Sequence, residues 1–129
     1  YNNGAAYRFE TSLKQPKVII NTETIEQNWT EGCKLYWPRE KNQEYLTHCE
    51  AIFDELNISS LTKDMKGYLP ISLSTPKGTK VVIMESDLFD YPNLFLTGDR
   101  NSTLSGEFPP VVLKSAVKEG ADRLSGNLK

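Results

Sequence analysis

Two adjacent segments near the middle of this chain limit its possible folds more than any other feature. Apolar and small residues alternate over residues 69–74 (Leu-Pro-Ile-Ser-Leu-Ser). This alternation predicts a half-buried β-strand, with Pro70 near its start, where a missing N–H is tolerated. Residues 75–78 (Thr-Pro-Lys-Gly) are a strong turn signal. The nearly continuous apolar run Lys80–Met84 predicts a second strand, central in its sheet and covered on both faces. We therefore expect an antiparallel hairpin.

The rest of the chain repeats this pattern of short strands and turns. Alternation, or short β-branched and aromatic runs, predict further strands near residues 5–12, 17–21, 25–29, 35–37, 94–97 and 104–108. Residues 45–56 are ambiguous, because their apolar spacing fits either a helical stripe or an irregular strand. The fold class that follows is all-β and mainly antiparallel, arranged as a β-sandwich. We place the sandwich in residues 1–114 and expect residues 115–129 to be a mobile tail or linker.

Composition narrows the range of partners. The 129 residues fit one compact domain, and 38% apolar with 25% charged residues is ordinary globular composition. The net charge is −2 and the basic residues are scattered, so we expect no nucleic-acid partner. No apolar run has the length of a membrane span. The chain starts without Met or a signal-peptide pattern, and its last residues resemble an interruption. We expect a domain cut from a larger exported protein.

Cysteines and glycosylation motifs leave two alternatives open. Cys33 and Cys49 allow one disulfide, but two buried free thiols are the interpretation we favour. Three Asn-x-Ser/Thr motifs begin at Asn28, Asn57 and Asn101. They matter only in a host that glycosylates.

The residues needed for common catalytic sites are missing. His48 is the only histidine, so a Ser–His–Asp site would have to use it. Neither a Gly-x-Ser-x-Gly motif nor a glycine-rich phosphate loop is present. His48 with Cys33 and Cys49 would supply too few ligands for zinc. We therefore expect no complete catalytic site in this chain.

Acidic residues after the apolar run are the main candidate for a binding site. Glu85, Asp87 and Asp90 lie within six residues, and oxygen ligands of this kind suit a hard cation such as calcium. The alternative, which composition alone favours, is a solvated turn in which Asp87 caps one helical turn. Five aromatic residues form either a sugar-stacking platform or core, and for Trp37 and Phe95 core is favoured. The aromatic candidates are Tyr36, Trp37, Phe89, Tyr91 and Phe95.

Several motifs, in order along the chain, resemble the N-terminal domain of glycoside hydrolase family 97. The central one is residues 81–88 (VVIMESDL), followed by residues 90–96 (DYPNLFL). Residues 5–9 (AAYRF), 69–71 (LPI) and 106–110 (GEFPP) also resemble family motifs.

Three residues of the central motif depart from the family pattern. Met84, Ser86 and Asn93 stand where the family usually has Thr, Ala and Gly. Asn93 still tolerates the left-handed turn that Gly would supply. The departures leave the finer assignment of substrate open.

This resemblance implies that the chain is the later part of a β-sandwich similar to galactose mutarotase. The sandwich would belong to a large exported enzyme of a Gram-negative bacterium, located in the periplasm or associated with the outer membrane. Such enzymes resemble α-glucosidases or α-galactosidases, and a following (β/α)-barrel carries the catalytic residues. The barrel and an oligosaccharide substrate would be the partners. The resemblance also implies that Glu85 helps to hold a calcium ion in the full-length protein, with no ordered metal expected in the isolated chain.

A stand-alone carbohydrate-binding module or a surface adhesion domain is the alternative function, since a sandwich fold alone does not decide function. The sequence leaves open the sugar cleaved, retention or inversion of configuration, and the oligomeric state. Exposed strand edges of a partial sandwich would favour self-association.

Overall fold

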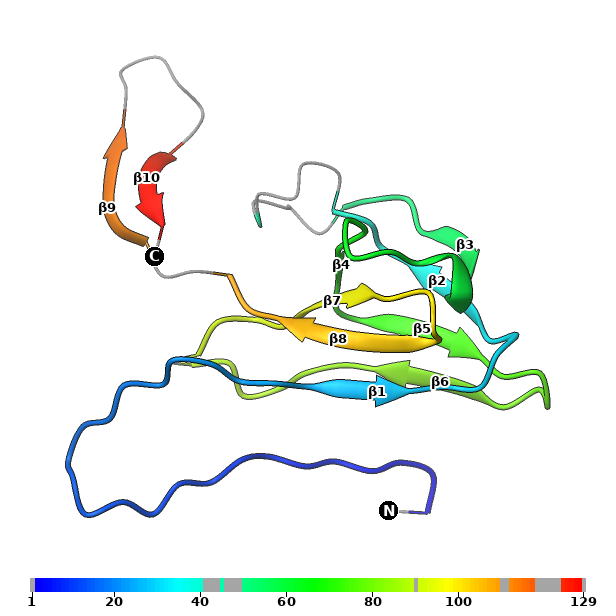
Figure 1. The fold of residues 1–129 in the computed structure, drawn as a ribbon, viewed down its shortest axis with the longest axis horizontal. Helices are drawn as coiled ribbons and strands as arrows, with labels where there is room; N and C mark the ends of the chain where they lie inside the picture. The colour runs from blue at the N-terminus through cyan, green and yellow to red at the C-terminus, as the bar shows by residue number, and fades with distance from the viewer. Residues whose placement is uncertain are drawn as a thin grey trace.

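The computed structural model describes residues 2–40, 45, 50–89, 91–109, 112–117 and 124–128. In these residues, two four-stranded antiparallel sheets dominate the fold, with one short 3₁₀ helix at Ile58–Ser60 (Figure 1). The first sheet has the order β1 (Glu26–Asn28), β8 (Thr103–Glu107), β7 (Phe95–Gly98), β4 (Gly67–Tyr68). The second has the order β3 (Asp54–Asn57), β2 (Lys34–Trp37), β5 (Ile71–Ser74), β6 (Lys80–Ile83). The predicted all-β, mainly antiparallel class is confirmed.

Side chains from both sheets meet in one hydrophobic core. Leu35 and Trp37 of β2 are fully buried, and their neighbours Lys34 and Tyr36 face outward, as the period of two in a strand requires. Among the described residues, the core cluster contains Cys33, Leu35, Trp37, Ile58, Leu61, Ile71, Leu73, Leu94, Leu96 and Leu104, and Tyr68 and Phe95 are buried as well. Since full burial of each large apolar side chain contributes about 1.5–3 kcal/mol, this shared layer holds the two sheets together.

The predicted hairpin is confirmed. β5 and β6 pair antiparallel with Ile71 opposite Ile83 and Leu73 opposite Val81. The turn between them closes through the N–H of Gly78, which donates to the carbonyl of Thr75 at 2.9 Å.

The predicted central position of the apolar strand is wrong. β6 lies at the edge of its sheet, next to β5 only, among the strands that the structure describes. Val81 and Ile83 pack against the core, but Val82 and Met84 are exposed. The continuous apolar run therefore has only one face covered by described parts of this chain.

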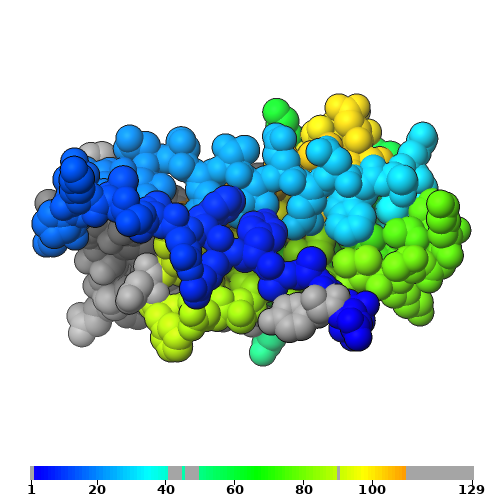
Figure 2. Space-filling view, turned by 90° about the horizontal axis from the view of Figure 1, so that it is seen from below, coloured from blue at the N-terminus to red at the C-terminus, as the bar shows by residue number. Residues whose placement is uncertain are grey.

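The strands predicted near residues 5–12 and 17–21 are also absent. Within the described part, residues 2–25 contain no strand, and Tyr7, Phe9 and Ile19 are exposed. A strand needs a hydrogen-bonded neighbour, and the described sheets offer this segment none. Figure 2 shows the segment, in blue, running across one face of the molecule. The ambiguous stretch 45–56 ends in β3, and residues 46–49 lie outside the described residues.

Two more strands follow the sandwich. β9 (Val112–Val117) and β10 (Leu124–Leu128) pair antiparallel as a separate two-stranded sheet. The division of the chain at residue 114 stays a prediction.

Cys33 is a buried free thiol, and Cys49 lies outside the described residues. Among the described residues, no helix has the length and apolar character needed to cross a membrane.

Candidate functional site

The loop that joins β6 to β7 carries the candidate residues. Glu85 stands at its start, and Oε2 of Glu85 accepts a hydrogen bond of 2.9 Å from the backbone N–H of Leu94. Leu94 is buried and directly precedes β7. The carboxylate of Glu85 therefore closes the base of the loop and holds both of its ends in place.

Glu85 also lines a shallow pocket of about 330 Å³ at this end of the sandwich. Its walls come from Leu69, Pro70, Met84, Glu85, Leu88, Asn93 and Leu94. The pKa of the Glu85 carboxyl group is raised, mainly by burial. The negative charge of Glu23 also raises this pKa, whereas the hydrogen bond from Leu94 lowers it. The negative charge of Glu85 is thus only partly compensated, which favours a cation nearby.

Tyr91 fixes the far side of the same loop. Its hydroxyl donates a hydrogen bond to Oε2 of Glu23, and its ring packs edge-on against Phe108, with centroids 5.6 Å apart. Glu23 was not a candidate in the sequence, because it lies 62 positions before Glu85 and no motif contains it. The tertiary structure brings the charges of Glu23 and Glu85 within range of each other.

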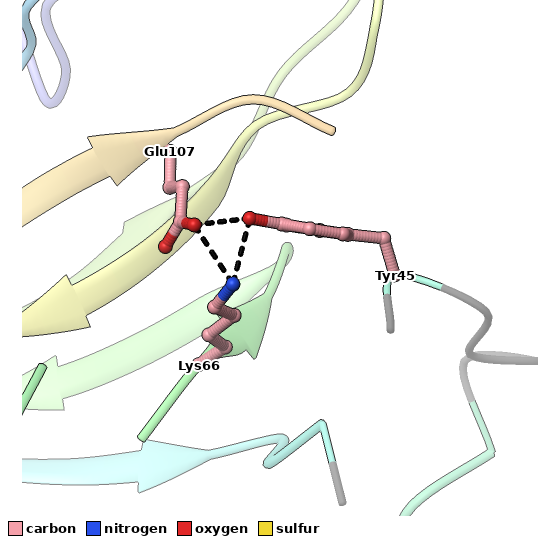
Figure 3. Close-up of polar contacts among 3 residues, drawn as sticks. All are labelled: Tyr45, Lys66 and Glu107. Atoms are coloured by element: carbon pink, nitrogen blue, oxygen red, sulfur yellow. Dashed lines mark hydrogen bonds and ion pairs between the residues drawn. The ribbon is translucent and has the colours of Figure 1, made fainter. Parts of the chain in front are cut away.

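A second polar cluster lies on the neighbouring part of the first sheet (Figure 3). Nζ of Lys66 lies 2.7 Å from Oε1 of Glu107 and 2.6 Å from the Tyr45 hydroxyl, which also donates to Glu107. Burial lowers the pKa of Lys66, but the contacts with Glu107 and Tyr45 outweigh it and the pKa is raised. The Tyr45 pKa is raised, mainly by burial. We call these three residues the Lys66 cluster.

The Lys66 cluster is a structural clamp rather than a reactive site, because its polar groups satisfy one another. The Tyr45 ring packs edge-on against Phe95 at 5.1 Å and lies under the Lys66 ammonium at 4.0 Å. Glu107 stands opposite Phe95 in the sheet register. Sequence patterns could not identify this cluster, since its members come from three distant segments.

The other sequence candidates do not gather around Glu85. Asp87 is exposed with φ 66°, and no helical turn follows it among the described residues, so the predicted cap is wrong. Asp90 and His48 lie outside the described residues. In the described part, no three His, Cys, Asp or Glu residues are placed to hold a metal ion together. Trp37 and Phe95 are core residues, as predicted.

Comparisons with known proteins cover nearly the whole chain. The family model described as "Glycosyl-hydrolase 97 N-terminal" matches residues 1–123. A protein from Bacteroides thetaiotaomicron named "Retaining alpha-galactosidase" is 29% identical over 135 aligned residues. The alignment covers 96% of this chain and 20% of that protein, so the chain spans about a fifth of the length of its curated relative. No solved structure gave a significant match.

Proposed function

Because the chain belongs to the glycosyl-hydrolase 97 N-terminal family, we propose that it is the non-catalytic N-terminal domain of an α-glycosidase. The family match over residues 1–123 is the observation that carries this proposal. The name of the relative supports α-galactosidase over α-glucosidase as the activity of the whole protein. The match also favours this function over a stand-alone carbohydrate-binding or adhesion module.

The proposed role of this domain is to support an active site on a following (β/α)-barrel. Glycoside hydrolysis needs two carboxyl groups on opposite sides of the scissile bond. The resemblance places both on the barrel, and the acids of this chain match neither. An oligosaccharide would bind at the barrel mouth, beside the end of the sandwich that carries Glu85.

Calcium is the cation that we propose for Glu85. One oxygen of its carboxylate already binds Leu94, which leaves Oε1 without a hydrogen bond among the described residues. Calcium takes six to eight oxygen ligands, so this chain would contribute one or two of them and the barrel the rest. The donor set fits a shared site between two domains and does not fit a complete site within this chain. Bound there, calcium would supply positive charge next to the substrate.

Assays on the full-length polypeptide and on this chain test the proposal. The full-length protein should hydrolyse nitrophenyl α-galactoside, with nitrophenyl α-glucoside as the competing substrate. The purified 129-residue chain should hydrolyse neither. Turnover by the isolated chain, with contaminating enzyme excluded, would contradict the non-catalytic assignment. A full-length protein inactive on both substrates would contradict the glycosidase assignment.

We also propose, from the resemblance, that the full-length protein is exported to the periplasm or the outer membrane. Cell fractionation with an antibody against this domain tests it, and a purely cytoplasmic signal would contradict it. Self-association through the exposed edge of β6 is a further proposal, which sedimentation of the purified chain would test.

A further inference from the structure

A hollow at the far end of β6 from Glu85 has the features of a ligand pocket. Its volume is about 510 Å³, and ligand pockets usually measure about 300–1,000 Å³. Thr79 in its wall directly precedes β6, whereas Glu85 follows that strand. The β1–β2 connection and the β5–β6 turn form this end of the sandwich (Figure 1). We call it the Trp29 pocket, and its wall includes Trp29, Thr30, Thr75, Pro76, Lys77 and Thr79.

Hydrogen bonds and close packing hold this wall in place. The N–H of Thr75 donates to the carbonyl of Thr79 at 2.8 Å, and the N–H of Thr79 donates to Oγ1 of Thr75 at 3.2 Å. A Cβ atom at Gly32 would lie only 3.3 Å from Cγ of Pro76, so the β1–β2 connection lies against the turn. The Trp29 side chain packs on the hydrophobic core. The Trp29 pocket is therefore preformed, as most small-molecule sites are.

The wall combines one aromatic ring, three hydroxyl groups and one ammonium group. Trp29 supplies the ring, Lys77 the ammonium group, and the threonines supply the hydroxyls. Lys77 and Thr79 are exposed, and their side chains make no ion pair or hydrogen bond with other described residues. These polar groups are thus available to a ligand.

A sugar ring fits this combination better than other classes of ligand do. The faces of a pyranose carry apolar C–H groups, which pack on an aromatic ring, and its rim carries hydroxyl groups. The hydroxyl and ammonium groups of the wall can donate hydrogen bonds to that rim, and the hydroxyls can also accept them. A purely apolar ligand would leave these polar groups unpaired. A metal cation would lack carboxylate ligands, because among the described residues the lining contains no Asp or Glu.

We propose that the Trp29 pocket is a secondary glycan-binding site, whose ligand is a neutral oligosaccharide of the same class as the substrate. This inference rests on the proposed function, in which the whole protein is an α-glycosidase. The four residues of β6 span about 13 Å between the pocket and Glu85, so the sugar ring that packs on Trp29 is not the ring at the proposed calcium site. The site would hold the protein on its substrate without taking part in hydrolysis.

NMR spectra of the ¹⁵N-labelled 129-residue chain test the proposal without any substitution. Raffinose and maltotriose are the probes, because the first carries an α-galactosyl unit and the second carries α-glucosyl units. We expect at least one of them to shift the indole N–H signal of Trp29 and the backbone signals of residues 75–79. The indole signal of Trp37, which is fully buried, should stay unchanged. Glycerol is the matched control, since it carries hydroxyl groups but no ring.

Substitutions then locate the site. Trp29→Ala removes the ring and should lower the affinity for the sugar at least about tenfold. Because Trp29 also packs on the core, Lys77→Ala and Thr79→Val test the same site from its exposed rim, and each should lower the affinity about threefold. Tyr36→Ala is the matched control, because Tyr36 is an aromatic residue outside the pocket with 45% of its surface exposed. This control should leave the affinity unchanged.

Each outcome decides between specific alternatives. If neither sugar shifts the signals of the Trp29 pocket, or if glycerol shifts them equally, the proposal is wrong. A loss of affinity with Tyr36→Ala but not with Lys77→Ala or Thr79→Val would place the sugar on the outer face of the sheet, which also overturns it. Binding at the pocket while the full-length protein shows no glycosidase turnover would support the site and contradict the proposed function. Turnover without binding at the pocket would do the reverse.

Discussion

The backbone N–H of Leu94 donates to Oε2 of Glu85 at 2.9 Å, and this single bond joins the two ends of the β6–β7 loop. Leu94 is part of the buried core, so the carboxylate is tied to the rigid part of the domain. The hydrogen bond occupies one carboxylate oxygen and leaves the other for a ligand. The structural role of Glu85 is therefore compatible with the proposed calcium-binding role, and substitutions can separate the two.

Two substitutions of Glu85 should have different effects. Glu85→Gln keeps an oxygen that accepts the Leu94 hydrogen bond, so the free energy of unfolding should change by less than about 0.5 kcal/mol. Loss of the charge should weaken calcium binding by the full-length protein and lower its turnover. Glu85→Ala removes the acceptor as well and should cost about 1–2 kcal/mol. Urea unfolding, calcium titration and glycosidase assays measure these effects.

The neighbouring Asp87 supplies the control for this experiment. Its side chain is exposed, and Asp87→Asn should leave calcium affinity unchanged. If Glu85→Gln retains wild-type calcium affinity and turnover, the assignment of Glu85 is wrong and Asp87 becomes the next acid to test.

The Lys66 cluster should matter more for stability than an exposed ion pair does. The Lys66 side chain is 12% exposed. Lys66→Met removes its hydrogen bonds to the Tyr45 hydroxyl and to Glu107. Tyr45 still donates to Glu107 in this variant. We expect a loss of about 1–2 kcal/mol in the free energy of unfolding. Lys34→Met breaks the exposed pair with Glu55 and should cost less than about 0.5 kcal/mol. Equal losses in chemical denaturation would contradict the clamp role.

Gly67 is required by the packing of Trp37. A Cβ atom at position 67 would lie 2.6 Å from Cε2 of the Trp37 ring, which is fully buried. Gly67→Ala should therefore destabilise the domain by about 1–3 kcal/mol through overpacking. Gly4→Ala, where a Cβ would meet no atom within 4 Å, is the control and should be nearly neutral. Thermal unfolding of both variants checks this, and a neutral Gly67→Ala would show that Trp37 has room to move.

Asp99 should contribute to the pH dependence of stability. Hydrogen bonds from the backbone N–H groups of Asn101 and Thr103 lower the pKa of its carboxyl group. For an acid with a lowered pKa in the folded state, the stabilisation is present above the ordinary value of 3.8 and is lost as the pH falls through the folded value. Urea unfolding between pH 5 and about pH 2 should show a shallower loss of stability for Asp99→Asn. An unchanged slope would contradict this role of Asp99.

Local patterns in the sequence predicted several of the strands, but they wrongly predicted strands at residues 5–12 and 17–21. The alternation over residues 69–74, the Thr75–Gly78 turn and the apolar run after it predict the β5–β6 hairpin, because neighbouring residues alone decide these signals. Trp37 and Phe95 could likewise be assigned to the core, because they are large aromatic residues within predicted strands. The proposal that Glu85 is a calcium ligand also came from a linear motif, through its resemblance to the family.

Tertiary structure alone decided which strands lie side by side and which faces are covered. The edge position of β6 depends on strand pairing, which the apolar run of Val81–Met84 does not encode. The bond between Glu85 and Leu94 spans nine residues, the contact of Tyr91 with Glu23 spans 68, and the pair Lys66–Glu107 spans 41. Such contacts leave no periodic signal in the sequence. They form only when the two sheets pack and bring distant segments to the same end of the sandwich.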